Sequence, residues 1–191
     1  MISLCLIVKD EGKNLRDFLN HHSDLFDELI IVDTGSKDDT ASIAKEFTDK
    51  VFSFKWNDDF SEARNFSISK ATKDYILWLD PDERISKKDF EKIKGLNKEE
   101  GYSFIQKSFT ENRGHPRYKD GCYIRRICKL FRNNNIKFIY PIHETVVEQT
   151  QHTKTNLASF NGENFFPLED REGKNFINKA GKIAHKAKIL N

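Results

Sequence analysis

Three carboxylates fall within four positions at Asp80, Asp82 and Glu83, directly after the apolar run Tyr75–Leu79. Carboxylates this close together repel one another unless a cation binds them. Their hard oxygen atoms suit Mg²⁺ or Mn²⁺, and such an ion could bridge a diphosphate. Ligands of open α/β sheets sit in the crevice beyond the carboxyl ends of the strands, which is where this cluster falls. The segment could equally form a solvated acidic turn that starts a helix, so both interpretations stay open.

Three further segments carry residue types that could serve a site. Asp33 opens an Asp-Thr-Gly-Ser turn after the apolar run 28–32, where its carboxylate could meet a ribose or base or could cap a helix. Arg64 could pair with a carboxylate for structure or contact a phosphate or base edge. His143 and Glu144 follow another apolar run and could supply a metal ligand and a base, or form a polar strand end. The Asp33 turn matches neither GxGxxG nor GxxxxGK(S/T), which disfavours a dinucleotide fold and a P-loop.

These residues must be positioned by the fold, and the first half of the chain alternates short apolar runs with amphipathic segments. That order predicts strands separated by crossover helices over a mostly parallel sheet, an α/β fold. Asp59 with Glu62 three residues later has the pattern of a capping box at one helix start. The expected strands are 2–8, 28–32, 51–54 and 75–79, and the expected helices are 13–20, 40–47, about 60–71 and 87–93.

The second half contains longer, partly alternating apolar runs without intervening helices. Strands are expected at 102–109, 123–131 and 137–147, as an antiparallel or mixed extension of the same sheet. Residues 110–121 and 161–173 are expected to be surface loops. No repeat or linker marks a domain boundary, so a single domain over 1–191 is expected.

Composition excludes several classes of protein. The 191 residues include 32 basic and 30 acidic side chains, and the net charge of +2 selects no polyanionic partner. A hydrophobic fraction of 37% supports one sizeable core and excludes a disordered chain. No run approaches the roughly 18 apolar residues of a membrane span, and the start lacks signal-peptide features, so a cytoplasmic location is expected. The three Cys form no CxxC pair, which argues against a disulfide framework and a zinc knuckle.

Six segments of the chain form a recognisable series. They read ISLCLIVKDE at 2–11, IIVDTGS at 30–36, NDDFSEARN at 57–65, ILWLDPDE at 76–83, KLFRN at 129–133 and IHE at 142–144. In order and spacing the series resembles the family 2 glycosyltransferases with the nucleotide-diphosphosugar (GT-A) fold, over about residues 2–147. The resemblance implies an α/β three-layer sandwich around a central, mostly parallel mixed sheet of Rossmann-like type, with antiparallel strands added in the second half. It also implies a nucleotide-binding half at 1–100 and an acceptor-side half at 101–172.

The resemblance assigns donor-side roles at matching positions. It implies that Val8 and Glu11 line the nucleotide pocket and that Asp33 binds the base or the ribose. Arg64 would contact the base or the phosphates. Asp80 would face the ribose or a metal-bound water.

On the metal and acceptor side, the resemblance implies that Asp82 ligates the divalent ion, Mn²⁺ or Mg²⁺, that holds the sugar diphosphate. His143 would complete the metal or diphosphate site, and Glu144 would be the base that deprotonates the acceptor. The sequence departs from the family pattern at Pro81, where a small residue is usual, which should stiffen the turn and leave both ligands in place. Three arginines are candidates for neutralising the departing diphosphate: Arg125, Arg126 and Arg132.

The implied activity is metal-dependent, inverting transfer of a sugar from a UDP- or GDP-sugar to a hydroxyl of a glycan, lipid-linked or protein acceptor. One alternative is a nucleotidyltransferase of the same general fold, but those proteins usually open with a Gly-rich basic loop, and Val8–Gly12 is acidic. Another is a non-catalytic module that binds a nucleotide sugar or a nucleic acid. The chain has no aromatic-basic RNA-binding signature, so no nucleic-acid partner is expected.

The last segment combines positive charge with apolar spacing. Five Lys and no acidic residue follow Glu172, and apolar residues recur there at helical spacing. This pattern predicts a basic amphipathic helix over 173–191. The helix could dock on the sheet with a solvated Lys face, or make a peripheral contact with an anionic surface at the inner face of the membrane.

Overall fold

The computed structural model describes residues 1–95, 101–109, 122–142, 144–148, 168–169 and 175–176. It divides the chain into two compact units, Met1–Lys98 with Leu130–Lys154 and Glu99–Lys129 with Thr155–Asn191. Each candidate site residue whose side chain is described lies in the first unit. The expected division into halves near residue 100 stays a prediction.

In chain order the elements are β1 (Ile2–Val8), α1 (Gly12–His22), β2 (Glu28–Asp33), α2 (Thr40–Phe47), β3 (Val51–Ser53), α3 (Phe60–Ile68), β4 (Tyr75–Trp78), α4 (Lys87–Lys94), β5 (Gly101–Phe109), β6 (Cys122–Arg132), β7 (Ile136–Ile139), β8 (Thr145–Glu148), β9 (Leu168–Glu169) and β10 (Asn175–Phe176).

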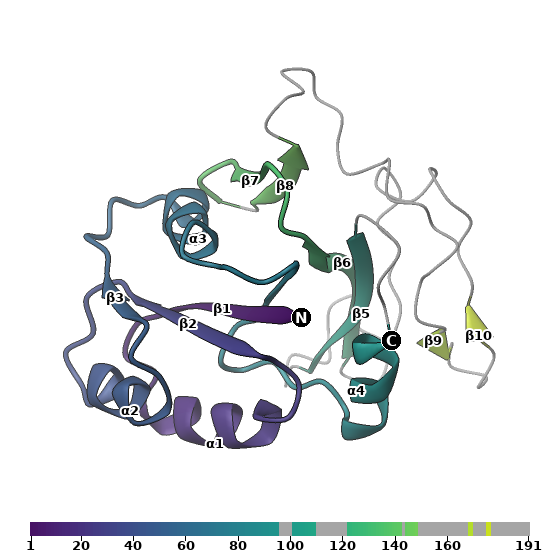
Figure 1. The fold of residues 1–191 in the computed structure, drawn as a ribbon, viewed down its shortest axis with the longest axis horizontal. Helices are drawn as coiled ribbons and strands as arrows, with labels where there is room; N and C mark the ends of the chain where they lie inside the picture. The colour runs from purple at the N-terminus through teal and green to yellow at the C-terminus, as the bar shows by residue number, and fades with distance from the viewer. Residues whose placement is uncertain (96–100, 110–121, 143, 149–167, 170–174, 177–191) are drawn as a thin grey trace. The chain divides into compact units, whose positions relative to one another are not determined.

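The main sheet has six strands in the order β3-β2-β1-β4-β6-β5 (Figure 1). β1 pairs in parallel with β2 and β4, and β2 pairs in parallel with β3, whereas β4 and β6 are antiparallel. Because β1 to β4 all run the same way, their last residues meet at one edge, which we call the carboxyl edge, and their first residues meet at the amino edge. This mixed, mostly parallel sheet confirms the expected α/β fold.

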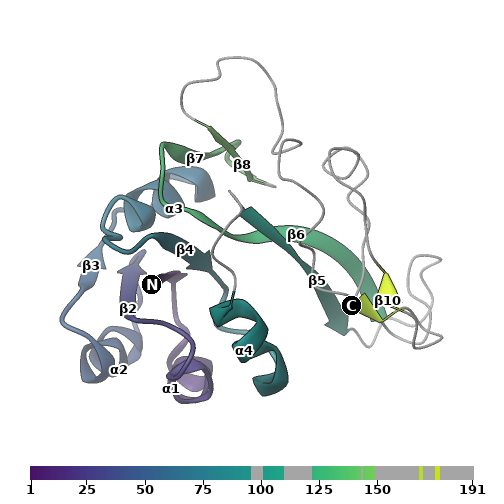
Figure 2. The ribbon, with the colours of Figure 1, turned by 45° about the vertical axis from the view of Figure 1, so that its right-hand side comes forward.

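Helices cover both faces of the parallel strands: α1 and α2 lie on one face and α3 on the other (Figures 1 and 2). Every residue of β1 is buried, as expected of a central strand that is covered on both sides. On the α3 side, Ala63 packs with Ile7 and Val32, near the ends of β1 and β2. This contact brings Arg64, the next residue of α3, to the carboxyl edge. Four aromatic side chains pack around the contact: Phe52, Phe54, Trp56 and Phe66.

Side-chain caps fix the helix starts near this edge. At α3 the Asp59 carboxylate accepts a hydrogen bond from the Glu62 amide at 3.0 Å, as the capping-box pattern predicts. At α2 the Asp38 carboxylate accepts from the Thr40 amide at 3.0 Å. The other oxygen of Asp38 accepts from the amide of Gly12, the first residue of α1, also at 3.0 Å. One carboxylate therefore satisfies amides at the starts of two helices.

The expectation of one strand over 137–147 is wrong. These residues form parts of β7 and β8, which pair with each other as a separate antiparallel hairpin. Tyr140, with a φ of +74°, and Pro141, which has no N–H, break the expected run. The Pro141 carbonyl instead accepts a hydrogen bond from the amide of Phe60 at 3.0 Å, at the start of α3. The break turns the chain toward α3 just before Glu144.

The expected C-terminal helix lies outside the described residues except at Asn175–Phe176, where the chain forms β10 and pairs with β9 instead. β9 itself falls within the stretch 161–173 that the sequence predicts to be a loop. The other expected loop, 110–121, lies outside the described residues. In the part of the chain that the structure describes, none of the helices is long and apolar enough to span a bilayer. Peripheral membrane contact stays a prediction.

Candidate functional site

Arg64 joins two of the candidate carboxylates at the carboxyl edge. Its Nε donates to Glu144 Oε1 at 2.6 Å, and its Nη2 donates to Asp80 Oδ1 at 2.9 Å. The guanidinium carbon lies 4.1 Å from the centre of the Trp78 ring and 5.8 Å from that of Phe138, within cation–π range. Only 6% of the Arg64 side chain is exposed. Three segments that are far apart in the sequence therefore meet at one buried cation.

The described ion pairs of this cluster join one cation to two carboxylates. Arg64 brings one positive charge, and the Asp80 and Glu144 carboxylates bring two negative ones. Burial acts to lower the pKa of the Arg64 guanidinium, but attraction to Asp80 and Glu144 outweighs burial and the pKa is raised. The Asp80 side chain is 38% exposed and that of Glu144 is 14% exposed. Asp80 is therefore the more accessible of the two carboxylates.

The acidic segment after β4 folds into a tight turn. The Glu83 amide donates to the Asp80 carbonyl at 2.9 Å, and the Asp80 amide donates to Glu83 Oε2 at 2.8 Å. Glu83 therefore closes the turn with its own side chain. Asp82 is exposed, and among the described residues none bonds to its carboxylate. Of the three acidic residues, Asp82 is the one best placed to meet a ligand.

The ends of β1 and β2 supply the second part of the site. Val8 and Asp33 are register partners at the carboxyl edge. The Val8 carbonyl accepts from the amide of Thr34 at 2.9 Å and from its hydroxyl at 3.1 Å. Ser36 donates to the Asp33 carboxylate through its amide at 3.0 Å and through its hydroxyl. The Val8 side chain is buried at the end of β1. Asp33 is partly exposed, and its carboxylate is held by Ser36.

The loop after β1 is tied to the loop after β2. The amide of Asp10, a residue with a φ of +54°, donates to Ser36 Oγ at 3.0 Å. The amide of Glu11 donates to Thr40 Oγ1 at 2.7 Å. A Cβ at Gly12 would lie 1.9 Å from a side-chain oxygen of Asp39 in the second loop, so a larger residue here would have to displace that side chain. Glu11 is therefore held at the carboxyl edge, where the sequence predicts it.

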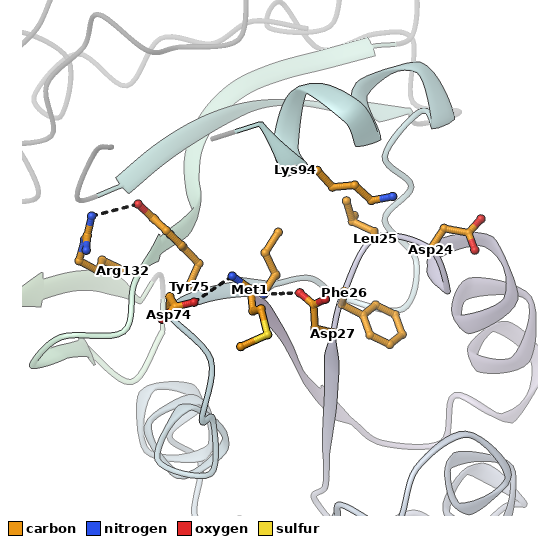
Figure 3. Close-up of a pocket in the computed structure, with 10 residues that line it drawn as sticks. Met1, Asp24, Leu25, Phe26, Asp27, Asp74, Tyr75, Lys94 and Arg132 are labelled. Carbon is orange, nitrogen blue, oxygen red and sulfur yellow. Dashed lines mark hydrogen bonds and ion pairs between the residues drawn. The ribbon is translucent and has the colours of Figure 1, made fainter. Parts of the chain in front are cut away.

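Arg132 lies away from these residues, at the amino edge. It pairs in register with Tyr75, the first residue of β4, because β6 runs antiparallel to β4. Its Nη2 donates to the Tyr75 hydroxyl at 3.3 Å, and both residues line a pocket of about 540 Å³ (Figure 3). The same pocket holds the N-terminal ammonium of Met1, 2.9 Å from Asp74 Oδ2. This placement contradicts the expectation that Arg132 neutralises the departing diphosphate, since an antiparallel strand carries its last residues to the opposite edge.

The structure does not describe the side chains of three candidates. His143 is outside the described residues. Arg125 and Arg126 belong to β6, in a stretch whose side chains are not described. Their roles at the metal or the diphosphate stay predictions.

The described carboxylates fit a divalent ion that arrives with its ligand. In the described ranges, no group of three or more His, Cys, Asp or Glu side chains is arranged to hold a metal ion. Asp82 offers an exposed carboxylate, and Asp80 offers a partly exposed one two positions earlier. Mg²⁺ is usually held by one or two carboxylates together with waters and substrate phosphates. A sparse pair of carboxylates is therefore the donor set that a metal–diphosphate complex needs.

Two residues at this edge are absent from the sequence-based candidates. Trp78 forms the flat surface beside the Arg64 guanidinium, and Ser36 fixes the Asp33 carboxylate. Trp78 is hidden in an apolar run, where an aromatic residue is expected to belong to the core. Ser36 carries a weak signal, because a Ser close behind an Asp in a Gly-containing turn commonly donates back to that Asp.

The chain belongs to glycosyl transferase family 2, whose model matches residues 3–156. It is 40% identical over 147 residues to a TPR repeat-containing protein of Synechococcus elongatus, a match that covers 76% of this chain and 35% of that protein. It is 36% identical over 149 residues to the SPbeta prophage-derived glycosyltransferase SunS of Bacillus subtilis, covering 75% of this chain and 34% of SunS. The chain thus spans about a third of the length of these relatives.

Solved structures of similar chains include residues 1–349 of TarS from S. aureus, with a TM-score of 0.49, 21% identity and coverage of 60% of this chain and 38% of that one. They also include the glucosyl-3-phosphoglycerate synthase of Mycobacterium tuberculosis in complex with Mn²⁺ and UDP-glucose. For that enzyme the TM-score is 0.39 and the identity 27%, over 43% of this chain and 33% of that one.

Proposed function

We propose that this chain is a metal-dependent glycosyltransferase domain that moves a sugar from a nucleoside-diphosphate sugar to an acceptor hydroxyl, with inversion at the anomeric carbon. The observation that carries the proposal is the gathering of Asp33, Asp80, Asp82 and Glu144 at the carboxyl edge of a family 2 chain. Ligands of mostly parallel sheets bind beyond this edge.

The donor lies across the ends of β2, β1 and β4 in this proposal. Asp33, fixed by Ser36, accepts hydrogen bonds from the ribose hydroxyls or the base. Val8 and Glu11 line the same pocket. Asp80 faces the ribose or a metal-bound water, and Asp82 ligates Mn²⁺ or Mg²⁺. When bound, such an ion offsets the negative charge of the diphosphate.

The departing nucleoside diphosphate needs further positive charge. Breaking the sugar–phosphate bond builds negative charge on the leaving group, which fixed cationic groups stabilise in a site closed to water. His143 is proposed to complete the metal or diphosphate site. Arg125 or Arg126 is proposed to contact the diphosphate, because Arg132 lies at the amino edge.

Glu144 is the proposed base. An acceptor hydroxyl has a pKa far above 7, so its proton must leave as the oxygen attacks, and a positioned carboxylate typically contributes about 10²–10⁴-fold. Glu144 Oε1 accepts from Arg64, and among the described residues Oε2 has no hydrogen-bond partner. Oε2 is therefore proposed to take the proton. Direct displacement by the activated oxygen inverts the anomeric centre without a covalent sugar intermediate.

The proposal names only the chemical class of the acceptor, a molecule with a free hydroxyl. A hydroxyl of a glycan, a lipid-linked molecule or a protein requires the same proton removal by Glu144. A cytoplasmic location, with peripheral contact between residues 173–191 and the inner face of the membrane, is part of the same proposal, and no nucleic-acid partner is proposed.

Calorimetric titration of UDP, and then of GDP, tests the metal-bridged donor site. The parent chain is expected to bind one of them more tightly with Mn²⁺ than with a chelator, and Asp82→Ala is expected to abolish that difference. Asp49→Ala is the matched control, because it removes an exposed carboxylate that precedes β3 at the amino edge. A parent chain without metal dependence, or an equal loss in Asp49→Ala, would refute the metal-bridged site.

A further inference from the structure

Arg64 uses one edge of its guanidinium group for two carboxylates. The N–H bonds of Nε and Nη2 point the same way, and a single carboxylate often takes both of them in a bidentate pair. Here Glu144 takes the first at 2.6 Å and Asp80 takes the second at 2.9 Å. One planar group therefore sets the spacing and the orientation of both carboxylates at once.

The guanidinium group is itself held in place. The Trp78 ring lies 4.1 Å from its carbon, and the side chain is almost fully buried, so water competes little for its donors. A lysine ammonium at this position would bring the same charge, but it has no planar fork and is a point donor. Arginine at position 64 thus provides a geometry as well as a charge.

We infer that Arg64 is a positioning residue, which aims Glu144 at the acceptor proton through the same pair of bonds that holds Asp80 on the donor side. This inference rests on the proposed function. It gives Arg64 a different role from the contact with the base or the phosphates that the family resemblance implies, because the Nε–Nη2 edge of the guanidinium binds carboxylates.

The test compares the full chain with Arg64→Met, Glu144→Gln and the double variant, using UDP as the binding probe and hydrolysis of UDP-glucose as the measure of turnover. Arg64→Met is expected to lower kcat by about 10²-fold, the loss typical of a misplaced reacting group, and to weaken Mn²⁺-dependent binding of UDP by much less, through the released Asp80 carboxylate. Because Arg64 acts through Glu144, the double variant is expected to be no slower than Glu144→Gln alone.

Two further variants separate position from charge and from general stability. Arg64→Lys restores the positive charge without the fork and is expected not to rescue turnover. Arg16→Met is the matched control, since Arg16 donates to Glu46 through both Nη atoms at 2.6 Å, on the surface of the molecule. It is expected to leave turnover and UDP affinity unchanged.

The following outcomes would overturn the inference. A loss of UDP affinity in Arg64→Met that matches the loss of kcat would show that Arg64 contacts the nucleotide. Losses that multiply in the double variant would show that Arg64 does not act through Glu144, and recovery of turnover in Arg64→Lys would show that charge alone suffices. A parent chain that binds no UDP in the presence of Mn²⁺ would overturn the proposed function, and this inference with it.

Thermal unfolding keeps the inference testable if the parent binds UDP but does not hydrolyse UDP-glucose. Arg64→Met leaves the Asp80 and Glu144 carboxylates facing each other without their shared cation. Adding Glu144→Gln removes one of the two charges and is expected to raise the Tm above that of Arg64→Met. A further fall in Tm would overturn the shared contact.

Discussion

At the amino edge of the sheet the buried carboxylate of Glu28 accepts hydrogen bonds from Ser3, from Lys50 and from both the amide (2.8 Å) and the hydroxyl (2.7 Å) of Thr72. At the carboxyl edge the arrangement is reversed, since a buried cation, Arg64, is shared by two carboxylates. The Glu28 side chain is only 4% exposed, whereas Asp80 is 38% exposed.

The difference separates a cluster that serves stability from one that can serve a ligand. Burial acts to raise the pKa of Glu28, but the bonds from Lys50, Ser3 and Thr72 outweigh it and lower the pKa to about 2. The Glu28 cluster is thus satisfied by the protein itself. The carboxyl edge keeps the carboxylates of Asp80 and Asp82 accessible to solvent, where they could bind a divalent ion.

Glu28→Gln is expected to lower the stability of the folded chain more than the other variants discussed below. The amide keeps the shape of the side chain but removes its charge from beside Lys50, and it places N–H donors among other donors. We expect the free energy of unfolding at pH 7 to fall by about 3 kcal/mol, the low end for breaking a buried ion pair, because Lys50 is partly exposed. Urea unfolding measures this change, and metal-dependent UDP binding at low urea should persist.

The matched control is Glu46→Gln at an exposed ion pair with Arg16. Exposed ion pairs contribute little to folding, so the variant should change stability little. Equal changes in the free energy of unfolding for the two substitutions would mean that burial of the Glu28 ion pair does not add to stability.

His22 adds a buried group whose charge state the fold restricts. It is fully buried on α1, where Nδ1 lies 2.9 Å from the Phe18 carbonyl and Nε2 accepts from the Ile85 amide at 3.2 Å. This pair of contacts requires the neutral ring with its proton on Nδ1. Burial lowers the pKa of His22 from 6.5 to about 4.

The pH dependence of unfolding should show this restriction. The unfolded chain takes up the His22 proton at a higher pH than the folded chain, so the stability from neutral His22 is complete above pH 6.5 and is lost as the pH falls toward 4. The loss should reach about 3 kcal/mol, and His22→Gln should flatten the curve of unfolding free energy between these two pH values. A slope that His22→Gln leaves unchanged would assign the titration to other groups.

Sequence reasoning predicts the elements that local patterns determine. The buried strands at 2–8, 28–33 and 75–78 stand within one residue of their predicted bounds, because continuous apolar runs between turn residues are typical of central strands. Half of the capping box is confirmed for a similar reason, since Asp59 and Glu62 belong to one helical turn: Asp59 caps the helix, whereas the Glu62 carboxylate accepts from Asn57. The same local order places Asp33 and Asp80 at strand ends.

Features that depend on distant pairing cannot be predicted in this way. The sequence leaves open whether Arg64 meets a carboxylate or a phosphate, because Glu144 is 80 positions away and arrives through the break at Tyr140. The prediction for Arg132 is wrong because the direction of β6, and not its composition, decides which edge of the sheet the last residue of β6 reaches. The register of an antiparallel strand is set by its partner, which the pattern of one segment does not reveal.

The most direct test of the account is hydrogen–deuterium exchange of the full chain with and without Mn²⁺ and UDP. We predict slower exchange at the carboxyl edge, in the amides of residues 34–36, 80, 82 and 83, because bound ligand would close that edge to water. The amides of residues 72–75 at the amino edge should be unchanged. Protection around Tyr75 and the pocket of Figure 3, without protection after β2 and β4, would contradict the account.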